Sequence, residues 1–121
     1  PVLERGRVLA RQGDASRDIP ACAACHGERL TGVLPNTPGL LGLPRDYLNA
    51  QLGAWRNGQR RAHAPDCMGH IARTLAPEDL QAVAAWLAAQ PLPADTHPAA
   101  SLPQAPALAC GSAALPAGRA R

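Results

Sequence analysis

The scarcity of large aromatic side chains is the feature that most limits how this chain can build a core. Its 121 residues include no Phe, one Tyr and two Trp. A chain of this length is expected to form one domain with a modest core, and such domains are only marginally stable. Since aromatic side chains are too few to fill the core, the composition suggests that something else occupies it. A large apolar cofactor could do so.

Charge and hydropathy argue against several classes of protein. The net charge is only +3 at pH 7, and no dense basic run with interleaved aromatic residues indicates binding of nucleic acid. No stretch approaches 18 consecutive apolar residues, so the sequence does not predict a membrane-spanning helix. We interpret Arg56, Arg60 and Arg61 as a solvated helix end.

The spacing of apolar residues predicts an all-α domain. Helices are expected at residues 3–13, 46–57 and 77–89, and loops at residues 31–44 and 61–73. We divide the chain into a domain of residues 1–90 and a Pro/Ala-rich tail of residues 91–121. The composition of the tail is typical of a disordered segment or an interaction arm.

The run Cys22-Ala23-Ala24-Cys25-His26 carries the clearest chemical signal in the sequence. In the pattern C-x-x-C-H, the two thiols add to the two vinyl groups of a haem and form thioether bonds. The two-residue gap on a helical turn spaces the sulfurs for one edge of the macrocycle, and His26 then lies beneath the iron. The motif therefore predicts one covalently bound haem c, with iron held by His26.

Met68 is the only methionine, and it lies between the second and third predicted helices. A thioether is a soft ligand, suited to iron in an electron-transfer site, and His/Met ligation raises the reduction potential. We predict that Met68 is the second axial ligand. Ligation by His26 and Met68 closes both axial positions, so that a substrate could not bind the iron.

With these residues the chain resembles the class I c-type cytochromes, and in particular one domain of the bacterial dihaem periplasmic cytochromes. The resemblance covers about residues 3–90 and rests on residues 19–27, 38–40, 47–52, Met68 and 80–87. It implies a cytochrome c fold with three main helices around one covalent haem.

The resemblance also implies roles for single residues. Gly6 and Trp86 match the positions at which the first and last helices of the family cross closely. Pro38 matches the proline whose carbonyl accepts a hydrogen bond from the proximal histidine, which would fix the ring of His26 and raise its basicity. The chain departs from the family at Cys67, where a proline usually precedes the ligand methionine, and at Ala76, which lacks a capping oxygen for the last helix.

Two cysteines remain once the haem takes Cys22 and Cys25. Haem attachment implies export to the periplasm, an oxidising compartment that favours pairing, so we expect a disulfide between Cys67 and Cys110. It would tie the tail to the Met68 side of the domain and contribute ~3–4 kcal/mol in the chain-entropy model. Two free thiols, or an intermolecular bridge from Cys110, are the alternatives. No signal peptide is visible, so an exported protein is expected to be present here in its processed form.

Two other functions fit part of the pattern. Cys22, Cys25, Cys67 and His70 form a legitimate ligand set for a structural zinc domain, although this reading leaves His26 and Met68 unexplained. A haem enzyme or gas sensor would need a labile sixth ligand, and His63 or His70 could replace Met68.

The expected function is single-electron transfer. No residue is a candidate for acid–base or nucleophilic catalysis, so the chain is predicted to be a carrier rather than an enzyme. It would act as a free periplasmic cytochrome or as the electron-transfer subunit of a dehydrogenase or oxidase. Its partners are expected to be redox proteins, met in small and transient complexes.

Overall fold

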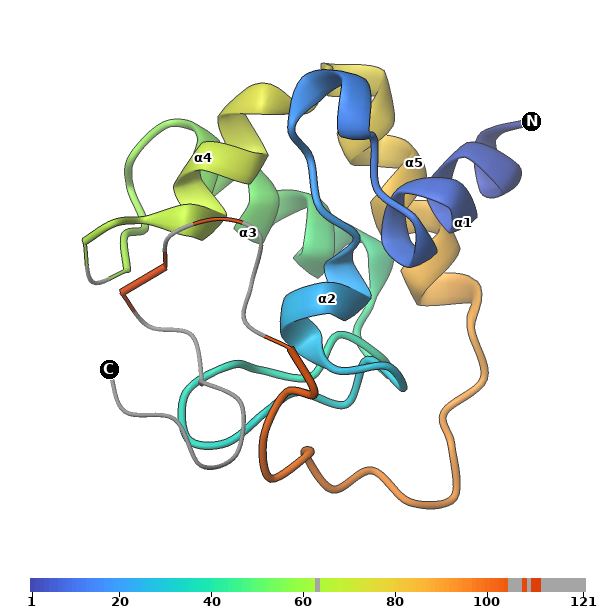
Figure 1. Ribbon diagram of the computed structural model, residues 1–121. Helices are drawn as coiled ribbons and strands as arrows, with labels where there is room; N and C mark the ends of the chain where they lie inside the picture. Colours follow the sequence, from blue (N-terminus) through green and yellow to red (C-terminus); the bar gives the residue numbers. More distant parts are fainter. Residues whose placement is uncertain (63, 105–107, 109, 112–121) are drawn as a thin grey trace.

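The computed structural model describes residues 1–62, 64–104, 108, 110 and 111. In these residues the regular structure is helical, with isolated β-bridges but no strand. The elements in Figure 1 are α1 (Val2–Arg11), a 3-10 helix (Ala15–Arg17), α2 (Cys22–His26), α3 (Arg45–Arg56), α4 (Cys67–Thr74) and α5 (Pro77–Ala89). The predicted all-α class is confirmed. None of the helices in this part of the chain is both long and apolar enough to cross a membrane.

The crossing of α1 and α5 is the largest helix–helix contact (Figure 1). It depends on Gly6, because a Cβ atom there would lie 2.7 Å from Cβ of Trp86 and also against the carbonyl oxygen of Ala82. At the edge of the crossing, Arg5 donates hydrogen bonds to both carboxylate oxygens of Asp79 at 3.0 Å. These bonds hold the pKa of Asp79 below its ordinary value.

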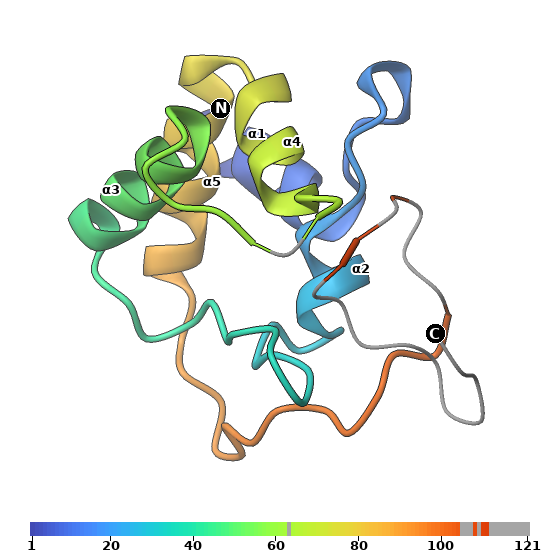
Figure 2. The same cartoon turned by 90° about the vertical axis from the view of Figure 1, so that its left-hand side faces the viewer.

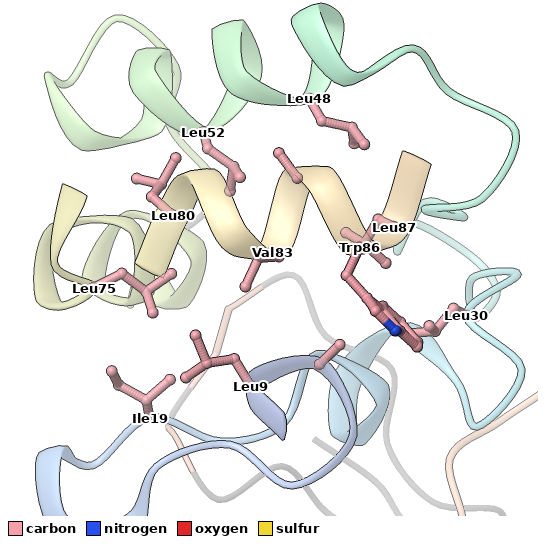
Figure 3. Close-up of a cluster of buried hydrophobic side chains, with 12 residues drawn as sticks. Leu9, Ile19, Leu30, Leu48, Leu52, Leu75, Leu80, Val83, Trp86 and Leu87 are labelled. Atoms are coloured by element: carbon pink, nitrogen blue, oxygen red, sulfur yellow. The ribbon is translucent and has the colours of Figure 1, made fainter. Parts of the chain in front are cut away.

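The main core gathers around α5, as Figure 3 shows. Leu48 and Leu52 of α3 approach α5 from one side, and Leu9 of α1 from the other. Apart from Trp86, this cluster consists of aliphatic side chains and alanines. Leucine packing therefore fills part of the centre in place of aromatic side chains. Another part of the centre is a large cavity, which is described below.

The predicted loop over residues 61–73 is wrong in its second half, where the chain forms α4. Asp66 begins this helix, because its side-chain carboxylate accepts a hydrogen bond from the backbone N–H of Gly69 at 3.0 Å. Ala72 and the following Leu75 are buried against the core. Met68 consequently lies in the first turn of a capped helix rather than in a loop.

The segment that follows α5 runs along the lower side of the domain in Figures 1 and 2. The backbone of Ala99 pairs with the loop that follows α2, since its N–H donates to the carbonyl of Gly32 at 2.9 Å and its carbonyl accepts from Leu34 at 2.8 Å. Leu102 is 2% exposed and packs with Val33. Composition alone suggested disorder here, but backbone pairing and the burial of one leucine hold residues 99–102 against the domain.

Candidate cofactor site

A cavity of about 750 Å³ lies between α2, α3, α4 and α5. Cys22, Cys25 and His26 of α2, together with Pro38 and Met68, line this one cavity. Most of the remaining wall is aliphatic; it includes Leu9, Leu48, Leu52, Ile71, Leu75, Val83 and Leu87. The structure therefore brings together the five residues that the sequence singled out for the cofactor.

The ring of His26 is oriented by the loop that carries Pro38. Nδ1 of His26 lies 2.8 Å from the carbonyl oxygen of Pro38. A carbonyl can only accept a hydrogen bond, so Nδ1 carries the proton and Nε2 keeps its lone pair. Burial lowers the pKa of His26, with the Pro38 bond acting against this. The imidazole is thus held in the tautomer that a metal ligand requires.

The two thiols of α2 are unpaired and lie at the cavity wall. Burial raises the pKa of Cys22 to about 11 and raises that of Cys25 in the same direction. Reactive C-x-x-C thiols of disulfide oxidoreductases have a lowered pKa. The raised values argue against a redox-active dithiol.

Two bonds made by the residues beside Met68 hold its turn of α4 in place. Asp66 caps the turn, and Cys67 forms a disulfide with Cys110, with the two Cα atoms 5.0 Å apart. Cys67 and Cys110 also line the cavity beside Met68. The sequence left three possibilities for Cys67 and Cys110: a disulfide between them, two free thiols, or an intermolecular bridge. The structure shows the disulfide between them.

The alternative ligands do not gather into a competing site. The disulfide engages Cys67, so the zinc set of Cys22, Cys25, Cys67 and His70 is incomplete. Among the described residues no group of three or more His, Cys, Asp or Glu side chains is arranged to hold a metal ion. His70 is exposed and lines a smaller neighbouring cavity instead, while His63 lies outside the described residues.

The arginines at the end of α3 have roles that sequence reasoning missed. Arg60 and Arg61 line the cavity, and Arg60 donates to the side-chain oxygen of Gln51 at 2.8 Å and lies 5.5 Å from the ring centroid of Trp55. Arg56 points elsewhere and donates to the carbonyls of Ala72 and Leu75 at 2.9 and 2.7 Å. The interpretation as a solvated helix end is therefore wrong for Arg56. The bonds of Arg56 could have been predicted only if the position of α4 relative to α3 had been known, and the sequence does not give it.

Replacing Arg56 with Met should lower the free energy of unfolding by ~1.5–3 kcal/mol. The substitution keeps the apolar stem but leaves two carbonyls at the end of α4 without their charged donor, a loss typical of hydrogen bonds to charged groups. Chemical denaturation followed by circular dichroism measures the change. Arg45→Met, at an exposed position at the start of the same helix, is the matched control, and an equal loss in both variants would contradict this role.

The site fits a haem in shape and in chemistry. A haem is a large apolar macrocycle with two carboxylates, and the cavity offers an aliphatic interior with Arg60 and Arg61 as cations in its wall. No Asp or Glu belongs to that wall in the described part of the chain. Two thiols one helical turn apart and an imidazole with a free Nε2 complete the donor set. A helical fold around such a site defines the class of covalent haem proteins.

Within that class the chain belongs to the cytochrome c family, whose model matches residues 4–91. It is a class I c-type cytochrome domain, and its cofactor is covalently bound haem c. It is 47% identical over 83 residues to the thiosulfate dehydrogenase electron acceptor of Stutzerimonas stutzeri, a match that covers 69% of this chain and 38% of that protein.

Solved structures show the same relationship. The thiosulfate dehydrogenase (TsdBA) of Marichromatium purpuratum matches with 39% identity and a TM-score of 0.63, over 81% of this chain and 19% of that one. Cytochrome c4 of Acidithiobacillus ferrooxidans matches with 32% identity and a TM-score of 0.65, over 73% of this chain and 49% of that one. The chain thus spans less than half the length of these proteins and corresponds to one of their parts.

Proposed function

We propose that this protein is a single-electron carrier whose haem c is joined to Cys22 and Cys25 and ligated by His26 and Met68. The observation that carries the proposal is the convergence of these four residues on one apolar cavity. The bound haem supplies an iron that alternates between two oxidation states. The protein chain would hold this iron and determine which ligands it has.

The chain contributes by fixing the ligands. The Nδ1–H bond to Pro38 orients the imidazole of His26 and raises its basicity. The thioether of Met68 would be the second protein ligand of the iron and would favour the reduced state. With both ligands held in place by the chain, little rearrangement would accompany the gain or loss of an electron, and no position on the iron would be left for a substrate.

The partners we propose are redox proteins, and the chain itself is not an enzyme. The likeness to a protein named thiosulfate dehydrogenase electron acceptor, and to a structure of thiosulfate dehydrogenase itself, supports a dehydrogenase of this kind as the electron donor. The haem edge beside Cys22 and Cys25 would pass the electron in a small, transient complex. We place this function in the periplasm, where c-type cytochromes of bacteria typically act.

We also propose that residues 1–90 form the haem domain and residues 91–121 a tail, packed on it through the described residues 91–104, 108, 110 and 111; the rest of the tail lies outside the described residues. The backbone bonds between Ala99 and the loop at Gly32 and Leu34 support this division. So does the disulfide between Cys67 and Cys110.

Absorption spectra and a potentiometric titration of the exported protein test the proposed function, with Met68→Leu as the decisive variant. Leu has a similar volume but is a hydrocarbon that cannot bind iron. We expect the far-red absorption band of sulfur ligation to vanish, and the potential to fall by on the order of 0.1–0.2 V, within the roughly 0.8 V range that axial ligands span.

Ile71→Leu, which changes another residue of α4 in the cavity wall, is the matched control and should keep the band. A wild-type protein that lacks the band, or whose reduced form binds carbon monoxide readily, would instead support an enzyme or gas sensor with an open sixth position.

A further inference from the structure

The chain beyond α5 contacts both segments that carry the proposed axial ligands. We propose that the described residues after α5 (92–104, 108, 110 and 111), here called the strap, position both ligands through two separate contacts, one on the His26 side made by Ala99 and Leu102 and one on the Met68 side made by Cys110. The inference rests on the proposed function, because it assumes that Met68 ligates the iron. It assigns a role to Leu102 and Cys110, which lie beyond the family match at residues 4–91.

The first contact reaches His26 through the loop of residues 32–38. Ala99 pairs with Gly32 and Leu34 on either side of Val33, and Leu102 buries itself against Val33. Gly32 in turn donates its N–H to the carbonyl of His26 at 2.8 Å. The same loop ends at the Pro38 carbonyl that orients the imidazole. A short series of bonds thus joins the strap to both the backbone and the ring of His26.

The second contact is made directly beside Met68. The disulfide joins Cys110 of the strap to Cys67, the residue before Met68, and Gly111 donates its N–H to the carbonyl of Pro65 at 3.0 Å. Cys67 and Cys110 both lie in the cavity wall. Movement of the first turn of α4 would carry Met68 away from the cavity, and the disulfide restricts that motion.

The two contacts differ from the rest of the strap. Between α5 and Ala99 its polar tie to the domain is the ion pair of Asp95 with Arg29, 3.4 Å long, in which both side chains are more than half exposed. Exposed ion pairs of this kind contribute little. The buried or covalent contacts of the described strap therefore coincide with the two ligand-bearing segments.

The test measures how fast imidazole replaces Met68 in the oxidised holoprotein, a process whose rate reports the release of the sulfur. In Cys67→Ala/Cys110→Ala we expect this rate to rise at least about tenfold, which corresponds to ~1.4 kcal/mol. We also expect the far-red band to disappear at a lower temperature than in the wild type. Asp95→Ala removes the exposed tie of the same strap and should leave both values unchanged.

Leu102→Ala tests the other contact and does not depend on the stability of the disulfide variant. It loosens the loop that carries Pro38, so we expect a changed midpoint potential and perturbed proton resonances of His26, with imidazole exchange closer to wild type. A role limited to overall stability would lower the unfolding temperature of both variants, yet leave exchange rate, potential and resonances as in the wild type. That outcome overturns the strap proposal.

The wild-type spectrum separates the two hypotheses. A wild-type protein without the far-red band contradicts the proposed ligation and this inference together. A wild-type protein with the band, whose disulfide variant exchanges imidazole at the wild-type rate, contradicts the Met68 contact alone.

Discussion

Replacing both Cys22 and Cys25 with Ala should abolish not only covalent haem attachment but the fold itself. The site leaves a cavity of about 750 Å³ between the core helices. Without haem, the aliphatic wall of this cavity would face water, in a domain whose whole stability is expected to be only ~5–15 kcal/mol. The chain without haem therefore cannot keep this arrangement open, and we expect a collapsed or unfolded state.

The measurement combines two readouts on protein exported with the haem-attachment machinery present. Pigment that resists acidified acetone reports covalent haem, and far-ultraviolet circular dichroism reports the helices. Cys67→Ala/Cys110→Ala replaces the same number of cysteines and should retain both signals. A colourless Cys22→Ala/Cys25→Ala protein with wild-type helicity and a cooperative unfolding transition would show that the leucine core suffices without the cofactor.

The second large effect is expected at the crossing of α1 and α5. Gly6→Ala places a methyl group 2.7 Å from Cβ of Trp86 and against the carbonyl of Ala82. These are atoms close to or within the backbone of α5, so a side-chain rotation cannot relieve the contact and the helices must separate. We expect a loss of ~1–3 kcal/mol or more in the free energy of unfolding, as for other overpacked cores.

Gly53→Ala is the matched control, because it makes the same chemical change within a helix. A Cβ atom on Gly53 meets nothing within 4 Å. The change should therefore stabilise the protein by ~0.5–1 kcal/mol, the usual helix preference of Ala over Gly. Chemical denaturation of the two variants should thus show effects of opposite sign, and a gain in both would contradict the close crossing.

The sequence was informative wherever the chemistry is local. The C-x-x-C-H run places two thiols and an imidazole on one helical turn, so residues 22–26 indicate a covalent haem without knowledge of any other contact. Three helices were also predicted within one or two residues of α1, α3 and α5, and the last matches Pro77–Ala89 at both ends. Each is ten or more residues long, which is enough for an apolar repeat to be recognised.

Contacts between distant segments were decided by the tertiary structure alone. The eight residues of α4 are too few for a clear periodic signal, and its start depends on the Asp66 cap. The partner carbonyls of Arg56 lie 16 and 19 residues away in the sequence. The backbone partners of Ala99, the carbonyl of Gly32 and the N–H of Leu34, lie more than 60 residues away. Sequence periodicity records which face of a helix is apolar, but it holds no information on which backbone group a side chain or a tail will meet once the helices have packed.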